Sequence, residues 1–236
     1  MTDSEFADCG AGGSGIDSVG CHEVVVARNV FDGGMGNAVQ AKGGSTDFDI
    51  RQNRIRITGS RALNLGGSTD LALFRPSLST SAPNAEARRV RAYNNVITGL
   101  GVDATPFAFV GCVDCLAAHN LAIGQQRWNL RILQETTDGG GYTFEPSGES
   151  RVINNAFVFS AASLSTAVNV GGDTAPETFT FAGNSWYASD DPGQSAPDLP
   201  VAEAGGHSGV ATGYEAVPLD PRAALDDAVC SQAGTL

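Results

Sequence analysis

The sequence predicts an all-β protein built as a parallel β-helix, a solenoid of short strands. Three observations lead to this prediction: glycine fills 30 of 236 positions, only 17% of the residues are charged, and short alternating apolar runs recur along the chain. Abundant glycine, asparagine and valine, with little glutamate, lysine or leucine, disfavours a helical protein. The length suffices for one large domain with its own core.

A repeat of about 24 residues organises the chain. GGSTD occurs at 43–47 and 66–70, GGDT at 171–174, and VGC at 19–21 and 110–112. Most of these tracts precede a second short run that ends in an asparagine, and the aligned asparagines are Asn29, Asn53, Asn95, Asn120, Asn155 and Asn184. Their spacings of 24, 42, 25, 35 and 29 residues fit one unit with insertions near 77–87 and 137–150. The long second spacing predicts one further coil at 71–76, in which Arg75 and Pro76 stand where the asparagine would fall.

Apolar residues flank every aligned asparagine. Three residues before it stand Val26, Ile50, Ala92, Ala117, Val152 and Phe181, and two residues after it stand Phe31, Ile55, Ile97, Ala122, Phe157 and Trp186. Runs with period 2 are strands, and a unit this short is no propeller blade. It fits one rung of a parallel β-helix, ~4.8 Å above the last. The asparagines would then stack as a ladder, each in a left-handed turn conformation, and the apolar residues would fill the lumen.

The tracts QAKGGS, ALNLGGS, FVGC, RILQET and NSWYA resemble β-helix proteins of the pectin-lyase-like superfamily, in particular a group of uncharacterised bacterial repeat proteins. The resemblance covers roughly residues 15 to 188. It implies a right-handed parallel β-helix of about six to seven coils, but no single chemistry, because the superfamily includes lyases, hydrolases, tailspikes and adhesins. We expect residues 1–188 to form the β-helix, with missing N-terminal coils as an open alternative, and residues 189–236 to form an irregular acidic segment.

The net charge and its distribution along the chain limit the classes of ligand that the protein could bind. A net charge of −12 argues against a general nucleic-acid binder. Residues 190–236 carry eight carboxylates and one arginine, so the repeat region is much closer to neutral and is compatible with an anionic glycan. No apolar run approaches the ~20 residues that span a bilayer, and we expect no membrane partner and a monomer. No signal peptide is visible, and the resemblance alone implies a secreted or cell-surface protein.

The strands before the glycine tracts carry a set of polar residues. They are Asp17, Gln40, Lys42, Asn64, Arg131, Gln134, Glu135 and Asn169. If these side chains point outward, they form one polar column along which an extended polysaccharide could lie. The alternative is that they are ordinary polar positions on the surface of a strand.

The resemblance and this column together predict a polysaccharide lyase. In β-elimination a base removes the proton next to a uronate carboxylate while a cation neutralises the developing charge. Lys42 and Arg131 could take either part beside Glu135, and Arg75 and Arg88 could clamp carboxylates. Asp17, Gln40, Asn64, Asn169 and the Trp128 ring would bind the substrate. Two alternatives stay open: a hydrolase, which needs two carboxylates across the scissile bond, and a non-catalytic glycan-binding or adhesion module.

The sequence predicts no cofactor. The histidines lack the spacing of a metal site, and His22 is more plausible as a turn residue than as an acid or base. Asp47 and Asp70 recur in the GGSTD turns and are expected to bond their own backbone. A Ca²⁺ site around Asp47 and Asp49 is the open alternative.

Five cysteines do not form a disulfide framework in so long a chain. Residues i and i+3 of a strand lie ~10 Å apart, so Cys112 and Cys115 are expected to be packed thiols unless the chain turns between them. Cys9 and Cys21 are the one pair worth testing for a bridge.

Overall fold

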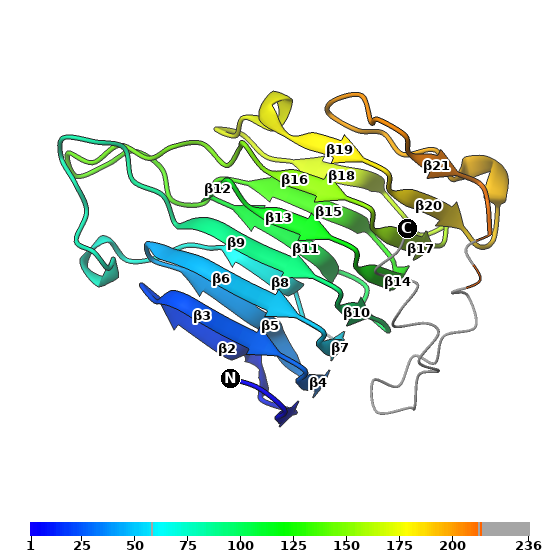
Figure 1. Ribbon diagram of the computed structural model, residues 1–236, viewed down its shortest axis with the longest axis horizontal. Coiled ribbons are helices and arrows are strands. Elements are labelled where there is room, and N and C mark those ends of the chain that lie inside the picture. The colour runs from blue at the N-terminus through cyan, green and yellow to red at the C-terminus, as the bar shows by residue number, and fades with distance from the viewer. Residues whose placement is uncertain (58, 212, 214–236) are drawn as a thin grey trace.

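The structure is a computed structural model that describes residues 1–57, 59–211 and 213. Its described residues form 21 strands and three short 3₁₀ helices, η1 (Leu71–Leu73), η2 (Pro176–Thr178) and η3 (Pro192–Gln194), with no α-helix among them. The strands build a parallel β-helix, as predicted (Figure 1). None of the helices described is long and apolar enough to cross a bilayer.

Three parallel sheets run along the solenoid. Sheet 1 contains β1 (Glu5–Ala7), β4 (Val30–Gly33), β7 (Arg54–Ile57), β10 (Val96–Ile97), β14 (Leu121–Gln125), β17 (Ala156–Phe159), β20 (Ser185–Ala188) and β21 (His207–Ser208). Sheet 2 contains β2 (Gly10–Val19), β5 (Met35–Lys42), β8 (Arg61–Gly66), β11 (Thr105–Val110), β15 (Trp128–Leu133) and β18 (Thr166–Val170). Sheet 3 contains β3 (His22–Ala27), β6 (Ser45–Arg51), β9 (Ala87–Tyr93), β13 (Leu116–Ala118), β16 (Arg151–Ile153) and β19 (Thr180–Ala182), and β12 (Cys112–Val113) pairs with β9.

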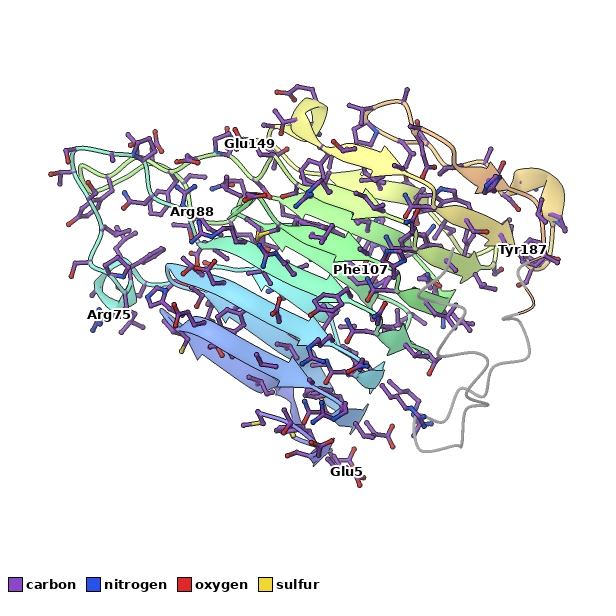
Figure 2. The ribbon with its side chains drawn as sticks, in the orientation of Figure 1. Glu5, Arg75, Arg88, Phe107, Glu149 and Tyr187 are labelled. Atoms are coloured by element: carbon purple, nitrogen blue, oxygen red, sulfur yellow. A yellow bond between two sulfur atoms is a disulfide. The ribbon has the colours of Figure 1, made fainter. Side chains whose placement is uncertain are left out.

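Each coil passes from sheet 2 to sheet 3 to sheet 1, and neighbouring strands within a sheet follow chain order. Two long loops, 67–86 between β8 and β9 and 134–150 between β15 and β16, leave from the same corner of the solenoid. They extend together beyond the strands, on the side where Arg75 is labelled (Figures 1 and 2). The strand cycle ends at β20, and within the described part of the chain only β21 continues a sheet beyond it.

The predicted coil at 71–76 does not exist. β7 pairs directly with β10, and Asn53 bonds directly to Asn95. Residues 71–73 instead form η1 within the first long loop. The prediction was wrong because a loop costs little extra chain entropy as it lengthens, so a coil can grow without adding a rung.

The lumen is filled by the residues that flank the asparagines. All twelve predicted flanking positions are at most 1% exposed. In sheet 3 they pair from coil to coil as Val26, Ile50, Ala92, Ala117, Val152 and Phe181, and in sheet 1 as Phe31, Ile55, Ile97, Ala122, Phe157 and Trp186. The rings of Phe157 and Trp186 stack with centroids 4.4 Å apart, so Trp186 is a core residue, as expected.

The asparagine ladder lies inside the turn between sheets 3 and 1. Both Asn53 nitrogens donate to Oδ1 of Asn95, at 3.0 Å from the backbone nitrogen and 2.9 Å from Nδ2. The remaining Nδ2 hydrogen of Asn53 reaches the Val26 carbonyl at 3.0 Å. The same pattern repeats at every step from Asn29 to Asn184. Buried amides therefore bond successive coils together.

The residue before each asparagine, and not the asparagine itself, adopts the left-handed conformation. Arg28, Gln52, Asn94, His119, Asn154 and Gly183 have φ values between 53° and 65°. This corrects the prediction for the asparagines. The preceding residue makes the turn, which leaves the asparagine in position to bond both neighbouring coils.

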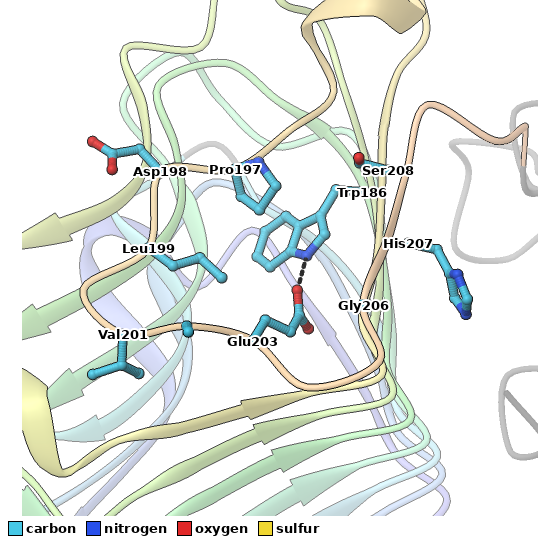
Figure 3. Close-up of a pocket in the computed structure, with 10 residues that line it drawn as sticks. Trp186, Pro197, Asp198, Leu199, Val201, Glu203, Gly206, His207 and Ser208 are labelled. Atoms are coloured by element: carbon cyan, nitrogen blue, oxygen red, sulfur yellow. Dashed lines mark hydrogen bonds between the residues drawn. The ribbon is translucent and has the colours of Figure 1, made fainter.

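Glu203 ends the ladder. Its Oε1 accepts from the backbone nitrogen and Nδ2 of Asn184, at 2.9 and 2.6 Å, and its Oε2 accepts from Nε1 of Trp186 at 2.8 Å. Pro197 and Leu199 lie over the Trp186 ring in the same turn of chain (Figure 3). The segment after β20 therefore covers the last rung of the core.

Replacing Asn95 by alanine should lower the free energy of unfolding by about 2–4 kcal/mol, because both Asn53 nitrogens lose their buried acceptor and Asn120 Oδ1 loses one of its two donors. Chemical denaturation of wild type and variant measures this loss. Asn94→Gly is the matched control: Asn94 has φ 54° and no partner for its buried Oδ1, so this change should cost about 1 kcal/mol or less. Equal losses in both variants would contradict the role assigned to the ladder.

Candidate functional site

Sheet 2 places five of the predicted polar residues in one register. Asp17 pairs with Gln40, Gln40 with Asn64, Asn64 with Ala108, Ala108 with Arg131, and Arg131 with Asn169. Ala108 is the one apolar member of this column. Gln134 and Glu135 lie just beyond β15, at the start of the second long loop.

The column differs in exposure along its length. Gln40 and Asn64 are buried, whereas Asp17 is exposed and Arg131 and Asn169 are half-buried. Oε1 of Gln40 accepts from Nδ2 of Asn37 at 3.2 Å and from the Ser14 hydroxyl at 3.4 Å. The end of the column near Arg131 therefore offers more accessible polar groups than its middle.

Lys42 lies apart from the other two predicted catalytic residues. Its Nζ is 3.3 Å from Oδ2 of Asp17. β5 and β15 are separated by β8 and β11, so the Lys42 and Arg131 backbones are three rungs and two residues along the strand apart, about 16 Å. The structure brings Arg131 and Glu135 close to one another and leaves Lys42 with Asp17 in a second group.

Arg61 is the residue that joins the Arg131 group and that the sequence did not single out. Its guanidinium forms a two-pronged ion pair with Glu135, and its Nη1 lies 3.5 Å from Oδ1 of Asn64. Its Nε is buried and has no hydrogen-bond partner in the described structure. Glu135 starts a loop and Arg61 starts a strand 74 residues earlier, so no local pattern marks the pair.

Arg131 carries a half-buried charge that no carboxylate neutralises directly. Its Nε donates to Oδ1 of Asn169 at 3.0 Å, and the described residues include no ion-pair partner for it. Burial lowers the pKa of Arg131, and the positive charges of Arg61 and Arg127 lower it further, against the opposing effect of Glu135. This corner of sheet 2 is therefore a site of positive charge.

Trp128 is held between arginines. The guanidinium carbons of Arg127 and Arg131 each lie 4.2 Å from the ring centroid, a cation–π geometry. Arg127 also pairs with Asp103 at 2.6 Å. The two cations occupy stacking surface that a sugar ring would use, so Trp128 serves first to hold Arg131 in place.

The two predicted clamp arginines are engaged by residues of the long loops. Arg88 pairs with both oxygens of Glu145, at 2.9 and 2.6 Å, and so ties β9 to the second loop. Nη1 of Arg75 donates to the carbonyls of Ala72 and Phe74. Both arginines thus have structural partners, and Figure 2 shows Arg75 on the outlying first loop.

Glu86 anchors both loops to the coils, a role that no pattern in the sequence predicted. Its side chain is fully buried. Oε2 accepts from the Gly43 nitrogen at 2.8 Å and from the Thr69 hydroxyl at 2.7 Å, and Oε1 accepts from the Thr136 hydroxyl. One carboxylate therefore joins a turn of the second coil to both long loops beside sheet 2.

Cys112 and Cys115 form a disulfide, which corrects the expectation of packed thiols. The chain turns between β12 and β13, where Asp114 has φ 55°, and this turn brings the two Cα atoms to 6.1 Å. Cys9 and Cys21 are free, so the bridge considered between them is absent. Cys230 lies outside the described residues.

The turn aspartates have structural roles. Asp70 accepts from the Ala72 nitrogen at 2.9 Å, as expected, and caps η1. Asp47 instead pairs with Arg89 at 2.7 and 2.8 Å, and this hydrogen bonding holds the pKa of Asp47 down at about 2. Throughout the described ranges, no cluster of three or more His, Cys, Asp or Glu side chains could hold a metal ion.

Comparison of the chain with known protein families, with curated proteins and with solved structures finds no significant match. The chemistry of the site therefore rests on the residues themselves.

Replacing Glu86 by alanine should lower the free energy of unfolding by about 2–4 kcal/mol, because three donors lose a buried acceptor. Hydrogen exchange should rise in both loops, 67–86 and 134–150, and remain low in the ladder turns. Glu149→Ala, in the second loop but exposed, is the control and should leave exchange unchanged. Exchange that rises evenly over the whole solenoid would contradict the anchoring role.

Proposed function

We propose that the protein binds an acidic polysaccharide along the outer face of sheet 2. The observation that carries this proposal is the Arg131 guanidinium, half-buried, without an ion-pair partner in the described structure, and close to Arg61 and Arg127. A partly desolvated charge without a partner is costly, and a carboxylate supplied by a ligand would relieve that cost. A planar guanidinium also matches a carboxylate with two parallel hydrogen bonds.

The shape of the surface supports a polymeric ligand. The column from Asp17 to Asn169 presents one position per rung and spans five steps, about 24 Å. An extended chain of sugars could follow this line, with Arg131 and Asn169 as accessible hydrogen-bonding positions. Lys42, two residues beyond Gln40 in β5, would supply a second cation further along the same face.

The resemblance to the pectin-lyase-like superfamily supports the same ligand class. Polysaccharides of this kind occur outside cells, so the proposal includes a secreted or cell-surface location. It also includes a monomer, since one solenoid carries the whole column.

Arg131→Ala should weaken binding of polygalacturonate or alginate about tenfold or more, the loss expected for a hydrogen-bonded charge pair. Affinity electrophoresis or calorimetry measures the change, and added salt should weaken binding by the wild type. Arg91→Ala is the control, because Arg91 is exposed on β9 in sheet 3. Equal binding by both variants, or no binding of either polymer by the wild type, would refute the proposal.

Cleavage by β-elimination is a second candidate function, favoured by the closeness of Arg131 and Arg61, two cations that could hold one uronate carboxylate. A base at this site would take the proton next to the uronate carboxylate while the Arg131 guanidinium neutralises the developing charge. The electron pair left behind would form a carbon–carbon double bond, and the glycosidic oxygen would leave and take up a proton. The charge of Arg61 beside Arg131 would add to the stabilisation of the charge that develops on the carboxylate. Glu135 would position Arg61.

If the protein cleaves, unsaturated products should raise the ultraviolet absorbance of a uronate polymer, and Arg131→Ala should abolish the signal. Lowering the pH should slow the reaction, because the base must be unprotonated. Binding retained by the wild type across a panel of uronates, with no change in absorbance, would leave the non-catalytic module as the function.

A further inference from the structure

The outer face of sheet 1 carries an apolar cluster that is separate from the lumen. Its members are Val96, Leu121, Ile123, Ala156 and Val158. They alternate along β10, β14 and β17 with lumen residues such as Ala122 and Phe157, so their side chains point away from the lumen. β14 therefore begins with a continuous apolar run and β17 consists of one, a pattern typical of strands covered on both faces.

These outward side chains are buried. All five are at most 8% exposed, and Leu121 is fully buried. On sheet 3, by contrast, the outward residues Val25, Arg91 and Arg151 are exposed, as expected for the surface of a solenoid. The outer face of sheet 1 at β10, β14 and β17 is therefore a covered surface.

No apolar segment of the described chain lies across this cluster. Among the described residues, the only further apolar side chain packed against it is that of Tyr187. Tyr187 belongs to β20 of the same sheet and pairs with Val158, so it extends the cluster sideways and does not cover it. The cover must come from elsewhere.

The chain leaves the described structure beside this face. β21 pairs with β20 at the end of sheet 1, and the Gly209 nitrogen donates to the Trp186 carbonyl at 3.1 Å. The sequence continues for the 23 residues from 214 to 236. β10 lies four rungs from β21, about 19 Å, and a chain of this length can reach about 75 Å when extended. The segment is therefore long enough to reach every member of the cluster.

The composition of residues 214–236 suits this face. The segment carries four carboxylates and one arginine. Arg54 stands in register with Val96 at the border of the cluster, so an acidic segment meets a basic side chain there. The larger aliphatic residues of the segment before its last residue are Val217, Leu219, Leu225 and Val229.

We propose that residues 214–236 bind to the outer face of sheet 1 and cover the apolar cluster, with Leu219, Leu225 and Val229 supplying apolar contacts. This contact goes beyond the proposed function, because it lies on a different sheet and its ligand is part of the same chain. Without the cover, the cluster would be an exposed apolar patch of the kind through which proteins associate.

The accessibility of a cysteine in the full chain tests this contact. Ala156→Cys places a thiol within the cluster, and mass spectrometry of the peptide that carries it gives its rate of alkylation. The thiol should react at least tenfold faster when Leu219→Asp, Leu225→Asp and Val229→Asp are combined in the same chain, because the new charges resist burial against an apolar face.

The matched control adds the same charge elsewhere in the segment. Combining Ser231→Asp, Gln232→Asp and Thr235→Asp should leave the thiol at position 156 protected. Ala122→Cys, at a lumen position, should stay protected with either set of substitutions, which shows that the solenoid remains folded.

Val158→Cys repeats the measurement if Ala156→Cys does not fold, since both side chains belong to the cluster. Fast alkylation with the wild-type segment, or equal rates with the wild-type and the apolar-to-aspartate segments, would overturn the proposal. Protection that disappears on dilution would assign the cover to a second copy of the chain and would overturn it as well.

Discussion

The hydrogen bonds between stacked asparagines set the register of the coils, and the positions of the core columns and of the outer sheet residues follow from that register. Each Oδ1 accepts from two nitrogens of the neighbouring coil, so a coil cannot slide or tilt without breaking buried bonds. The apolar columns on either side of the turn, such as Phe31 to Trp186, pack only in that register. Because register is fixed in the turn, Arg131 and Asn169 lie one rung apart on the outer face of sheet 2.

The parts of the fold that repeat could be read from the sequence, and the parts that do not repeat could not. The ladder and its flanking positions recur in six coils, so each copy strengthens the prediction made from the others. The extra coil at 71–76 was inferred from spacing alone, and spacing does not separate a rung from a loop. The Cys112–Cys115 disulfide depends on the φ of Asp114, a single backbone angle that no periodicity reports.

The candidate site also has a repeating part that the sequence predicts and a non-repeating part that it does not predict. The polar column was visible because its members hold equivalent positions in successive strands. Arg61 and Glu86 were missed because their roles come from partners distant in sequence. Glu135, near the start of the 134–150 loop, pairs with Arg61, and only the folded chain shows that this leaves Arg131 without an ion-pair partner in the described structure.

Glu203 has a consequence for how solenoids of this type avoid growing. An asparagine at the end of the stack would offer an amide that accepts from one side and donates to the other, and so would act as a template for another rung. A carboxylate accepts hydrogen bonds but has no N–H to pass on. Glu203 receives the bonds of Asn184 and Trp186 and offers no donor beyond them. Glu203 therefore stops the asparagine ladder, because no side-chain donor continues the stack beyond it.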